Sequence, residues 1–134
     1  MSIPEDYLDL MEGSHVGFLA TVNTKCQPQV TPIWIEYDHE TGYVVFNTAE
    51  GRLKVKNIRS NPMVALSVPD SDNPYRYISL QGKVVSIDDD QEKAKAHINK
   101  LAHKYWGDNR DFPIPEGQKR LIVFVKPTSV HVSG

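Results

Sequence analysis

Short apolar runs separated by turn-forming residues occupy most of the chain. Runs rich in Val, Ile and aromatic residues, bounded by Gly, Pro, Asn or Asp, are typical of β-strands. Six strands are expected, over residues 16–22, 29–37, 43–48, 63–68, 75–87 and 121–125. Pro127 is expected to break the last strand, with residues 130–132 as its candidate continuation. Since short turns favour antiparallel neighbours, the pattern predicts a mainly β fold, a six-stranded antiparallel β-barrel with flanking helices.

Two short helices are expected in the first half of the chain. The first opens with a capping box at Ser2–Glu5, runs through Met11 and ends at Gly13. The second follows the strand over 43–48, occupies residues 51–60 and is closed by Asn61 and Pro62.

A longer third helix is predicted between Asp88–Asp90 and Gly107, because acidic residues favour a helix start and glycine its end. Its apolar residues fall on one stripe that should face the core, namely Ala94, Ile98, Leu101 and Tyr105. His97 and His103 are six positions apart and lie on different helix faces, so they do not form a chelating pair. No metal site is expected.

Composition narrows the function classes. A chain of 134 residues with a net charge of −2 is expected to form one domain, over residues 1–134, and gives no general reason to bind DNA or anionic membranes. Cys26 is the only cysteine, so an intrachain disulfide or a cysteine-based metal site is excluded. No apolar run is long enough to span a membrane and no secretory signal is evident, so a cytoplasmic location is expected.

The second helix carries four cations and no acidic residue: Arg52, Lys54, Lys56 and Arg59. Cations in the first helical turn are repelled by the helix dipole, so Arg52 and Lys54 indicate a bound anion, most simply a phosphate. The alternative is a solvated basic face. Nucleic acid is not expected, because a recognition helix has a partner helix nearby and single-strand sites have interleaved aromatic residues.

Pro32 stands in the middle of the strand over 29–37 and removes one ladder donor. The strand should therefore be bulged or lie at a sheet edge. Backbone groups near Val30, Thr31 and Ile33 are then free to serve a ligand, although a simple sheet edge is an equally direct interpretation.

Several short motifs, in this order and at these spacings, resemble the pyridoxamine phosphate oxidase-like split β-barrels, in particular their short flavin/deazaflavin branch. The motifs extend over residues 17–130 and are Gly17–Val22, Pro28–Trp34, Phe46–Thr48, Arg52–Asn57, Asn61–Pro62 and Pro74–Tyr77 followed by Gly82. The resemblance implies an FMN-binding-protein-like barrel that forms homodimers, with a cofactor in the groove between subunits. The apolar residues Trp34, Tyr37, Trp106 and Phe124 also favour a dimer, because a small barrel cannot enclose them all.

The same resemblance implies a set of cofactor contacts. The interrupted strand would present its backbone to the pyrimidine end of the ring, and the phosphate would lie near Thr48, Arg52 and Lys54. The complete set of implied cofactor-binding residues is Gln29, Val30, Thr31, Pro32, Ile33, Asn47, Thr48, Ala49, Arg52, Leu53, Lys54 and Tyr77. Tyr77 stands where relatives carry a flavin-contacting glutamine. No catalytic residue is assigned.

The spacing of the phosphate-binding cations favours coenzyme F420 over FMN, because Leu53 separates Arg52 from Lys54 as in deazaflavin-dependent relatives. The expected function is an F420-dependent oxidoreductase that transfers a hydride between the cofactor and a small organic substrate. The alternatives are an FMN-dependent oxidoreductase and a non-catalytic cofactor carrier. Pyridoxamine phosphate is not the expected substrate, because the end Val130–Gly134 lacks the oxidase's terminal motif.

Overall fold

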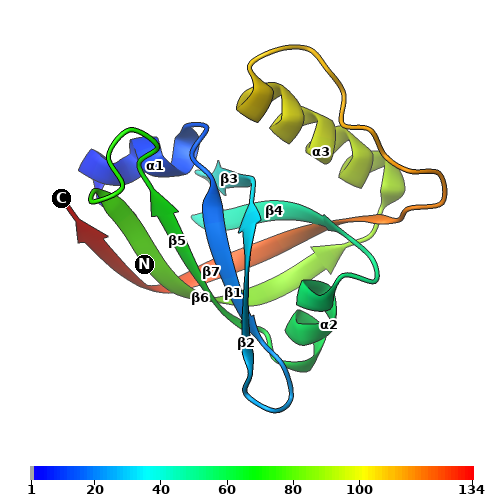
Figure 1. The fold of residues 1–134 in the computed structure, drawn as a ribbon, viewed down its shortest axis with the longest axis horizontal. Coiled ribbons are helices and arrows are strands. Elements are labelled where there is room, and N and C mark those ends of the chain that lie inside the picture. Colours follow the sequence, from blue (N-terminus) through cyan, green and yellow to red (C-terminus); the bar gives the residue numbers. More distant parts are fainter. Residues whose placement is uncertain (1) are drawn as a thin grey trace.

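One antiparallel sheet, curled on itself and flanked by helices, dominates the computed structural model, which describes residues 2–134 (Figure 1). Its seven strands lie in the order β2-β1-β5-β6-β7-β4-β3. The strands are β1 (Gly17–Val22), β2 (Pro28–Ile33), β3 (Ile35–Asp38), β4 (Tyr43–Ala49), β5 (Met63–Pro69), β6 (Tyr77–Asp88) and β7 (Arg120–Ser133). A 3-10 turn, η1 (Glu5–Tyr7), precedes the helices α1 (Leu8–Glu12), α2 (Leu53–Ser60) and α3 (Gln91–Trp106). The expected mainly β, antiparallel fold is confirmed.

The two edge strands of this sheet are consecutive in the chain and are separated only by Trp34. β2 pairs with β1, whereas β3 pairs with β4 at the opposite edge. The sheet must therefore curl until its edges meet at Trp34. The expected count of six strands was wrong by one, because the strand predicted over 29–37 changes its pairing partner at this residue and divides there.

The longest strands, β6 and β7, pair along most of their length, with register shifts at Gln81/Gly82 and Val84/Ser86. The expected break at Pro127 was wrong, because β7 runs through it. Pro127 pairs with Gly82 beside a register shift, where a missing ladder donor is tolerated. A β-carbon at Gly82 would lie 2.7 Å from Val125 Cγ1, so β6 and β7 approach too closely here for a side chain.

The helix ends follow their sequence signals only in part. Asp90 caps α3 by accepting from the backbone N–H of Lys93, and Gly107 ends it with a φ of 72°. The capping box expected at Ser2–Glu5 is absent, because Pro4 precedes η1 without any side-chain cap. Gly13 ends α1 as expected.

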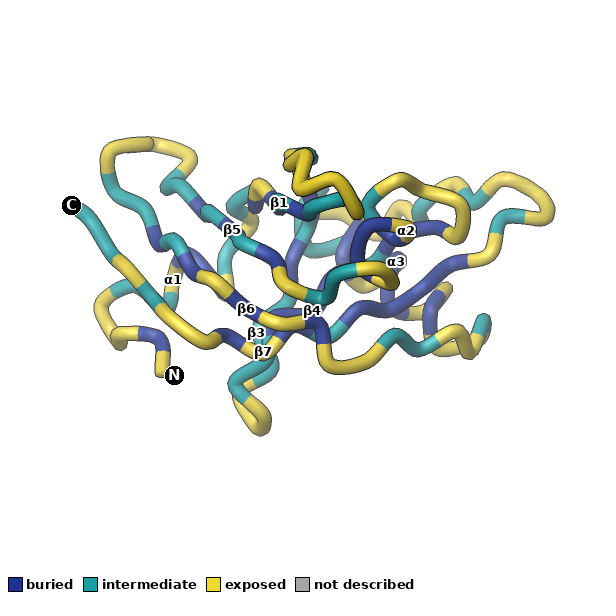
Figure 2. Tube along the Cα trace, turned by 90° about the horizontal axis from the view of Figure 1, so that it is seen from below, coloured by how far each residue is buried: buried dark blue, intermediate teal, exposed yellow. Residues whose placement is uncertain are grey.

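The core lies inside the curl, where buried strand segments face one another (Figure 2). Its largest fully buried side chains are Phe46, Leu10, Met11, Leu19, Ile35, Ile78, Leu101 and Leu121. α3 packs on β7 and β4, α2 on β1, and α1 on β3. The apolar stripe predicted for α3 is confirmed, since Ala94, Ile98 and Leu101 are all buried.

Tyr105 joins α3 to the point where the sheet closes. Its hydroxyl donates to the carbonyl of His15 at 2.8 Å and accepts from the backbone N–H of Ile35 at 3.0 Å. Ile35 is fully buried, so its N–H has no water to replace this acceptor. Burial also raises the pKa of Tyr105, which keeps the hydroxyl protonated.

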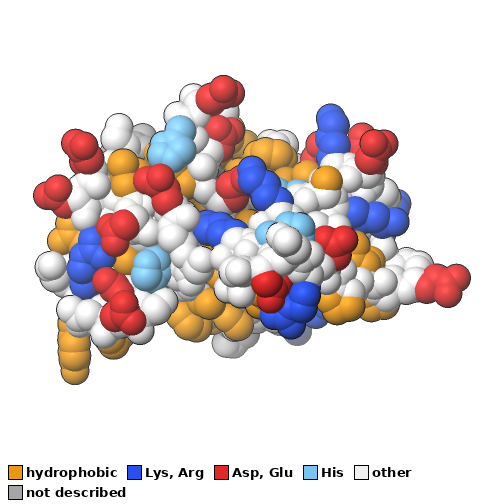
Figure 3. All heavy atoms as spheres, turned by 90° about the horizontal axis from the view of Figure 1, so that it is seen from above, with side chains coloured by type: hydrophobic (Ala, Val, Ile, Leu, Met, Phe, Trp, Pro, Cys, Tyr) orange, Lys and Arg blue, Asp and Glu red, His pale blue; other side chains and the backbone are white. Residues whose placement is uncertain are grey.

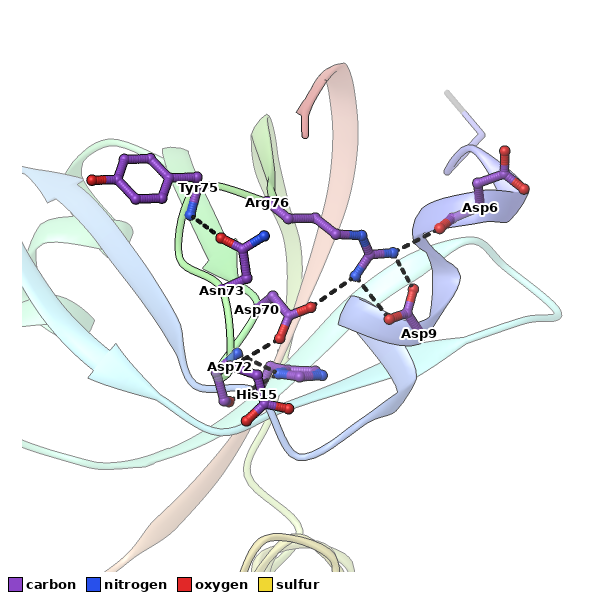
Figure 4. A network of polar contacts seen from close by, with 9 residues as sticks. Asp6, Asp9, His15, Asp70, Asp72, Asn73, Tyr75 and Arg76 are labelled. Atoms are coloured by element: carbon purple, nitrogen blue, oxygen red, sulfur yellow. Dashed lines mark hydrogen bonds and ion pairs between the residues drawn. The ribbon is translucent and has the colours of Figure 1, made fainter.

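Arg76 joins the N-terminal helix to the turn between β5 and β6 (Figure 4). Its guanidinium donates to both carboxylate oxygens of Asp9, at 2.7 and 2.9 Å, and to Asp70 at 3.2 Å. It also donates to the backbone carbonyl of Asp6 at 2.8 Å. The hydrogen bond from Arg76 holds the pKa of Asp9 below its usual value. This network links α1 to the β5–β6 turn, at the end of the sheet away from α2 (Figure 1).

Charges of both signs are interspersed with apolar side chains on the face shown in Figure 3. Within residues 2–134, no helix has both the length and the apolar character needed to cross a membrane. Nor do His, Cys, Asp and Glu side chains in this range gather in a group of three that could hold a metal ion.

Replacing Tyr105 with phenylalanine should lower stability by about 1–3 kcal/mol, because the buried N–H of Ile35 loses its acceptor. For a domain of this size the melting temperature should fall by roughly 3–12 °C. Thermal unfolding checks this, with Tyr75→Phe as the matched control, because Tyr75 is 84% exposed. Equal melting temperatures for the two variants would contradict the proposed role of the Tyr105 hydroxyl.

Arg76→Gln should weaken the dependence of stability on pH in the acid range. A carboxylate with a lowered folded pKa contributes stability above its unfolded pKa and loses it as the pH falls through the folded value. Wild-type stability should therefore drop below about pH 4, where free aspartates titrate, and the variant should lose less. Urea unfolding at several pH values measures this, with Lys25→Gln, an exposed site, as the charge-matched control.

Candidate functional site

A cavity of about 300 Å³ opens beside the point where the sheet closes. The residue between β2 and β3, the turn from β4 into α2, one face of α3 and the start of β7 all contribute to it. Its lining residues are Val16, Pro32, Ile33, Trp34, Asn47, Thr48, Ala49, Arg52, Lys54, Ile98, Leu101, Phe112 and Arg120. One side of this cavity is therefore apolar and the other carries cations.

The turn from β4 into α2 builds the polar corner. Gly51 adopts a φ of 90°, a conformation that glycine adopts without strain, and lets the chain reverse directly after the buried Thr48. Arg52 is the N-cap of α2, but no side chain caps the helix. The carbonyl of Arg52 accepts hydrogen bonds from the N–H groups of Val55 and Lys56. The N–H groups of Leu53 and Lys54, in the first turn of the helix, have no backbone acceptor within residues 2–134.

Three cations face this corner, and none has a carboxylate partner. Among residues 2–134, Arg52, Lys54 and Arg120 form no ion pair. Burial, and then the charges of Arg52 and Arg120, lower the pKa of Lys54. Burial and the charge of Arg52 lower the pKa of Arg120 in the same way. An anion bound here would relieve both effects, because it restores the favourable energy of the charged forms.

Arg120 is only 4% exposed and is held by neutral groups. Its Nε donates to Asn47 Oδ1 and its Nη1 to Gln118 Oε1, each at 2.9 Å. Its guanidinium lies 5.1 Å from the centre of the Phe112 ring. Within residues 2–134, Nη2 forms no hydrogen bond, so the guanidinium keeps donors for a ligand.

Aromatic side chains form a further part of the cavity surroundings, centred on Trp34. Trp34 stacks on Tyr105, with centroids 5.3 Å apart and planes 12° from parallel. Trp106 and Phe112 meet Trp34 edge-on at 5.4 and 6.1 Å. The break in the strand at Trp34 thus places a rigid apolar surface at the cavity mouth.

The edge strand β2 supplies a third kind of surface. It ends the sheet, so every second residue directs its backbone groups away from β1. Pro32 is paired with Phe18 in regular register, so it marks a simple sheet edge rather than a bulge. The Thr31 hydroxyl oxygen on this strand is buried and has no hydrogen-bond partner.

The structure brings together seven of the twelve residues predicted to bind a cofactor: Pro32, Ile33, Asn47, Thr48, Ala49, Arg52 and Lys54. Gln29, Val30 and Thr31 lie on β2 outside the cavity lining, and Leu53 points to solvent with 53% exposure. Tyr77 pairs with Ser133, at the end of β7 opposite Arg120. It is therefore remote from this cavity within one chain.

The sequence prediction missed six lining residues: Val16, Trp34, Ile98, Leu101, Phe112 and Arg120. The sequence did contain a signal for Arg120, because the cations Lys119 and Arg120 directly precede the apolar run Leu121–Val125. Ile98 and Leu101 read correctly as core residues, and only the packing of α3 beside β4 makes them a cavity wall. The other two cations of the basic helix do not line the cavity, since Arg59 forms an ion pair with Glu50 and Lys56 is exposed to solvent.

The donor set fits a flat apolar ring system that carries a phosphate. The uncapped helix start and three unpaired cations suit the anion, whereas the aromatic wall and strand edge suit a planar ring with polar edges. No cluster of ligating side chains competes with this interpretation among residues 2–134.

Comparisons with known proteins agree with the fold. The family model for pyridoxamine 5'-phosphate oxidase matches residues 3–132. The solved structure of an F420 reductase is 38% identical, covering 96% of this chain and 98% of that one, with a TM-score of 0.84. Two more distant structures share the fold. A conserved hypothetical protein from Mycobacterium tuberculosis is 21% identical, covers 99% of this chain and 86% of its own, and has a TM-score of 0.75. A heme storage protein from Vibrio cholerae is 14% identical, covers 100% of this chain and 96% of its own, and has a TM-score of 0.71. The chain belongs to the pyridoxamine 5'-phosphate oxidase family.

Proposed function

We propose that this protein is an oxidoreductase that binds coenzyme F420 in the cavity beside Trp34 and transfers a hydride between the cofactor and a small organic substrate. The observation that carries the proposal is the corner of Arg52, Lys54 and Arg120, three cations without a carboxylate partner in residues 2–134. Unpaired positive charge in a partly buried cavity is unfavourable unless a ligand supplies the anion.

The choice of F420 rests on two supports. Arg52 and Lys54 are separated by Leu53, and the F420 reductase of known structure is 38% identical over 96% of this chain. FMN is the alternative, because it offers a comparable phosphate and ring to the same surfaces. Both cofactors place an anion at the start of α2 and a planar ring at an apolar wall.

The bound cofactor would supply the hydride chemistry. The residues of the chain would bind and orient the cofactor, and they would exclude water from the cavity. Thr48, Arg52 and Lys54 would hold the phosphate together with the free N–H groups at the start of α2. Arg120 would contribute its unpaired donors from the opposite side, and the edge of β2 would hydrogen-bond the ring. Trp34 and Phe112 would shield one side of the cavity from solvent.

A titration of the purified protein with F420 and with FMN tests the proposal directly. Saturable quenching of cofactor fluorescence, tighter for F420, is the expected result. Oxidation of many equivalents of reduced F420 per protein chain, by an added electron acceptor that is reduced in turn, would then distinguish an enzyme from a carrier. Absence of binding to either cofactor would overturn the proposal.

Lys54→Ala should weaken cofactor binding by about 10- to 150-fold. A hydrogen bond to a charged group contributes roughly 1.5–3 kcal/mol, and each ~1.4 kcal/mol changes a dissociation constant tenfold. Lys56→Ala is the matched control on the same helix, because Lys56 is exposed and does not line the cavity. Its effect should stay below about threefold.

Fluorescence titration of both variants measures this contrast. Equal losses for the two variants would mean that α2 is only a diffuse positive surface and that the anion corner is wrongly placed.

We further propose that two copies of the chain associate through the outer face of β2, β1 and β5. The register places Phe18, Ala20 and Val30 on one side of the sheet, with Met63 at the end of the same face. Phe18, Val30 and Met63 are 42%, 61% and 49% exposed. Of the aromatic residues that the sequence suggested for a dimer, Trp34 lines the cavity and Trp106 packs edge-on against Trp34 within the chain.

Light scattering at micromolar concentration should give twice the chain mass of 15.2 kDa. The double substitution Phe18→Glu, Val30→Glu should shift the mass towards a monomer, because buried charges are costly at an interface. Tyr75→Glu is the control, since Tyr75 is exposed in a distant turn. A monomeric wild-type protein would refute this association.

A further inference from the structure

We propose that a chain of four side chains, Glu36, His97, Asn47 and Arg120, the first and third half-buried and the others buried, positions Arg120 at the anion corner and makes anion binding depend on the protonation of His97. The inference rests on the proposed function, because Arg120 matters only if an anion binds there. Asn47 and His97 are positioning residues in this scheme.

The first step concerns the orientation of the Asn47 amide. Its nitrogen donates to the Ala94 carbonyl at 2.9 Å, and its oxygen accepts from Arg120 Nε at 2.9 Å. A carbonyl only accepts and a guanidinium only donates, so the amide has a single satisfactory orientation. Asn47 therefore presents its second N–H to His97 Nδ1, 3.1 Å away.

The second step follows for His97. Since Asn47 donates to Nδ1, this nitrogen must be an unprotonated acceptor, and the ring is neutral with its proton on Nε2. His97 is only 9% exposed, and water has little access to replace these contacts. Nε2 lies 3.4 Å from Glu36 Oε1 and forms no closer hydrogen bond.

The third step is a conflict between the two sides of the ring. Glu36 on β3 is a carboxylate whose pKa is lowered to about 2, chiefly by the neighbouring His97 ring, and it favours a charged imidazolium. On the other side, Asn47 on β4 accommodates only the neutral ring. The other charged groups near Glu36 and Asn47 are cations. Lys100 on the same helix pairs with Glu36, Lys104 on this helix also interacts with Glu36, and Arg120 lies behind Asn47. All three oppose a further positive charge.

A proton on His97 Nδ1 would place two N–H groups against each other. Asn47 would have to turn its oxygen towards the ring, and its amide nitrogen would then face Arg120 Nε. Arg120 would lose the acceptor that fixes its guanidinium beside the cavity. We therefore expect acidification to release Arg120 and to weaken anion binding, because a pre-organised donor is worth more than a mobile one.

The coupling can be tested without any cofactor. In two-bond ¹H–¹⁵N NMR spectra at about pH 8, the His97 ring should show the tautomer protonated on Nε2. As the pH is lowered to about 5, the range over which histidines titrate, the Arg120 Nε–H signal should move with the His97 signals. The inference would be overturned by a ring protonated on Nδ1 at pH 8, or by an Arg120 Nε–H signal that does not change with pH together with the His97 signals. Either result would count whether or not F420 binds.

Binding measurements then connect the coupling to the site. His97→Asn keeps an acceptor near the position of Nδ1 but cannot titrate, and His103→Asn is the matched control. His103 lies on the same helix and pairs with the exposed Asp111, away from the cavity. F420 and FMN dissociation constants are measured at about pH 8 and pH 5.5 for wild type and both variants, together with inorganic phosphate as a ring-free probe.

Wild type and His103→Asn should lose about tenfold in affinity on acidification, the change that ~1.4 kcal/mol produces. Between pH 8 and pH 5.5, His97→Asn should lose clearly less affinity than wild type, whatever its affinity at pH 8. Protonation of the ligand's own phosphate is common to all three proteins, so it cancels in the ratio between them. An identical acid loss in His97→Asn and wild type would overturn the inference while leaving the proposed function intact.

Discussion

Closure of the sheet through a single residue is the constraint on which the rest of the structure depends. Because β2 and β3 lie at opposite edges and only Trp34 separates them, the sheet has to curl until these edges meet. The same closure places Trp34 against Tyr105 and brings α3 beside β4. The hydroxyl of Tyr105 then satisfies the buried backbone N–H that the change of pairing partner leaves at Ile35. The cavity exists because these elements converge at one corner of the curl.

Electrostatics at that corner explains why the cavity should hold an anion. The turn after β4 leaves a helix start uncapped, and it adds Arg52 and Lys54, while β7 begins with the buried Arg120. Neutral amides hold Arg120 in place without neutralising it. A ligand phosphate would supply the missing negative charge, and the chain Glu36–His97–Asn47 would make its binding depend on pH. In the proposed function, the anion corner would bind the phosphate of the cofactor and the aromatic wall would contact its ring.

Much of the fold was predictable, because local signals and tertiary packing agree. Alternating apolar runs identified the strands, and Asp90 and Gly107 marked the ends of α3. Three details were wrong for the same physical reason. The division at Trp34, the continuity of β7 through Pro127 and the absent capping box near Pro4 each depend on which strand or segment the chain meets, and a local pattern does not contain that information.

For the site, the sequence by itself determined the turn from β4 into α2, because strand, glycine turn and cationic helix start are consecutive in the chain. It also marked the edge strand through Pro32. Only the tertiary structure decided that Arg120, Phe112 and Trp34 join them, since these residues are distant in sequence and meet only when the sheet closes. The tertiary structure also showed that Tyr77 lies outside the cavity of its own chain. The register between β6 and β7 pairs Tyr77 with Ser133, at the end of β7 opposite Arg120. Contacts between neighbours in the chain follow from the chain itself, whereas contacts across a closed sheet follow from strand order and register.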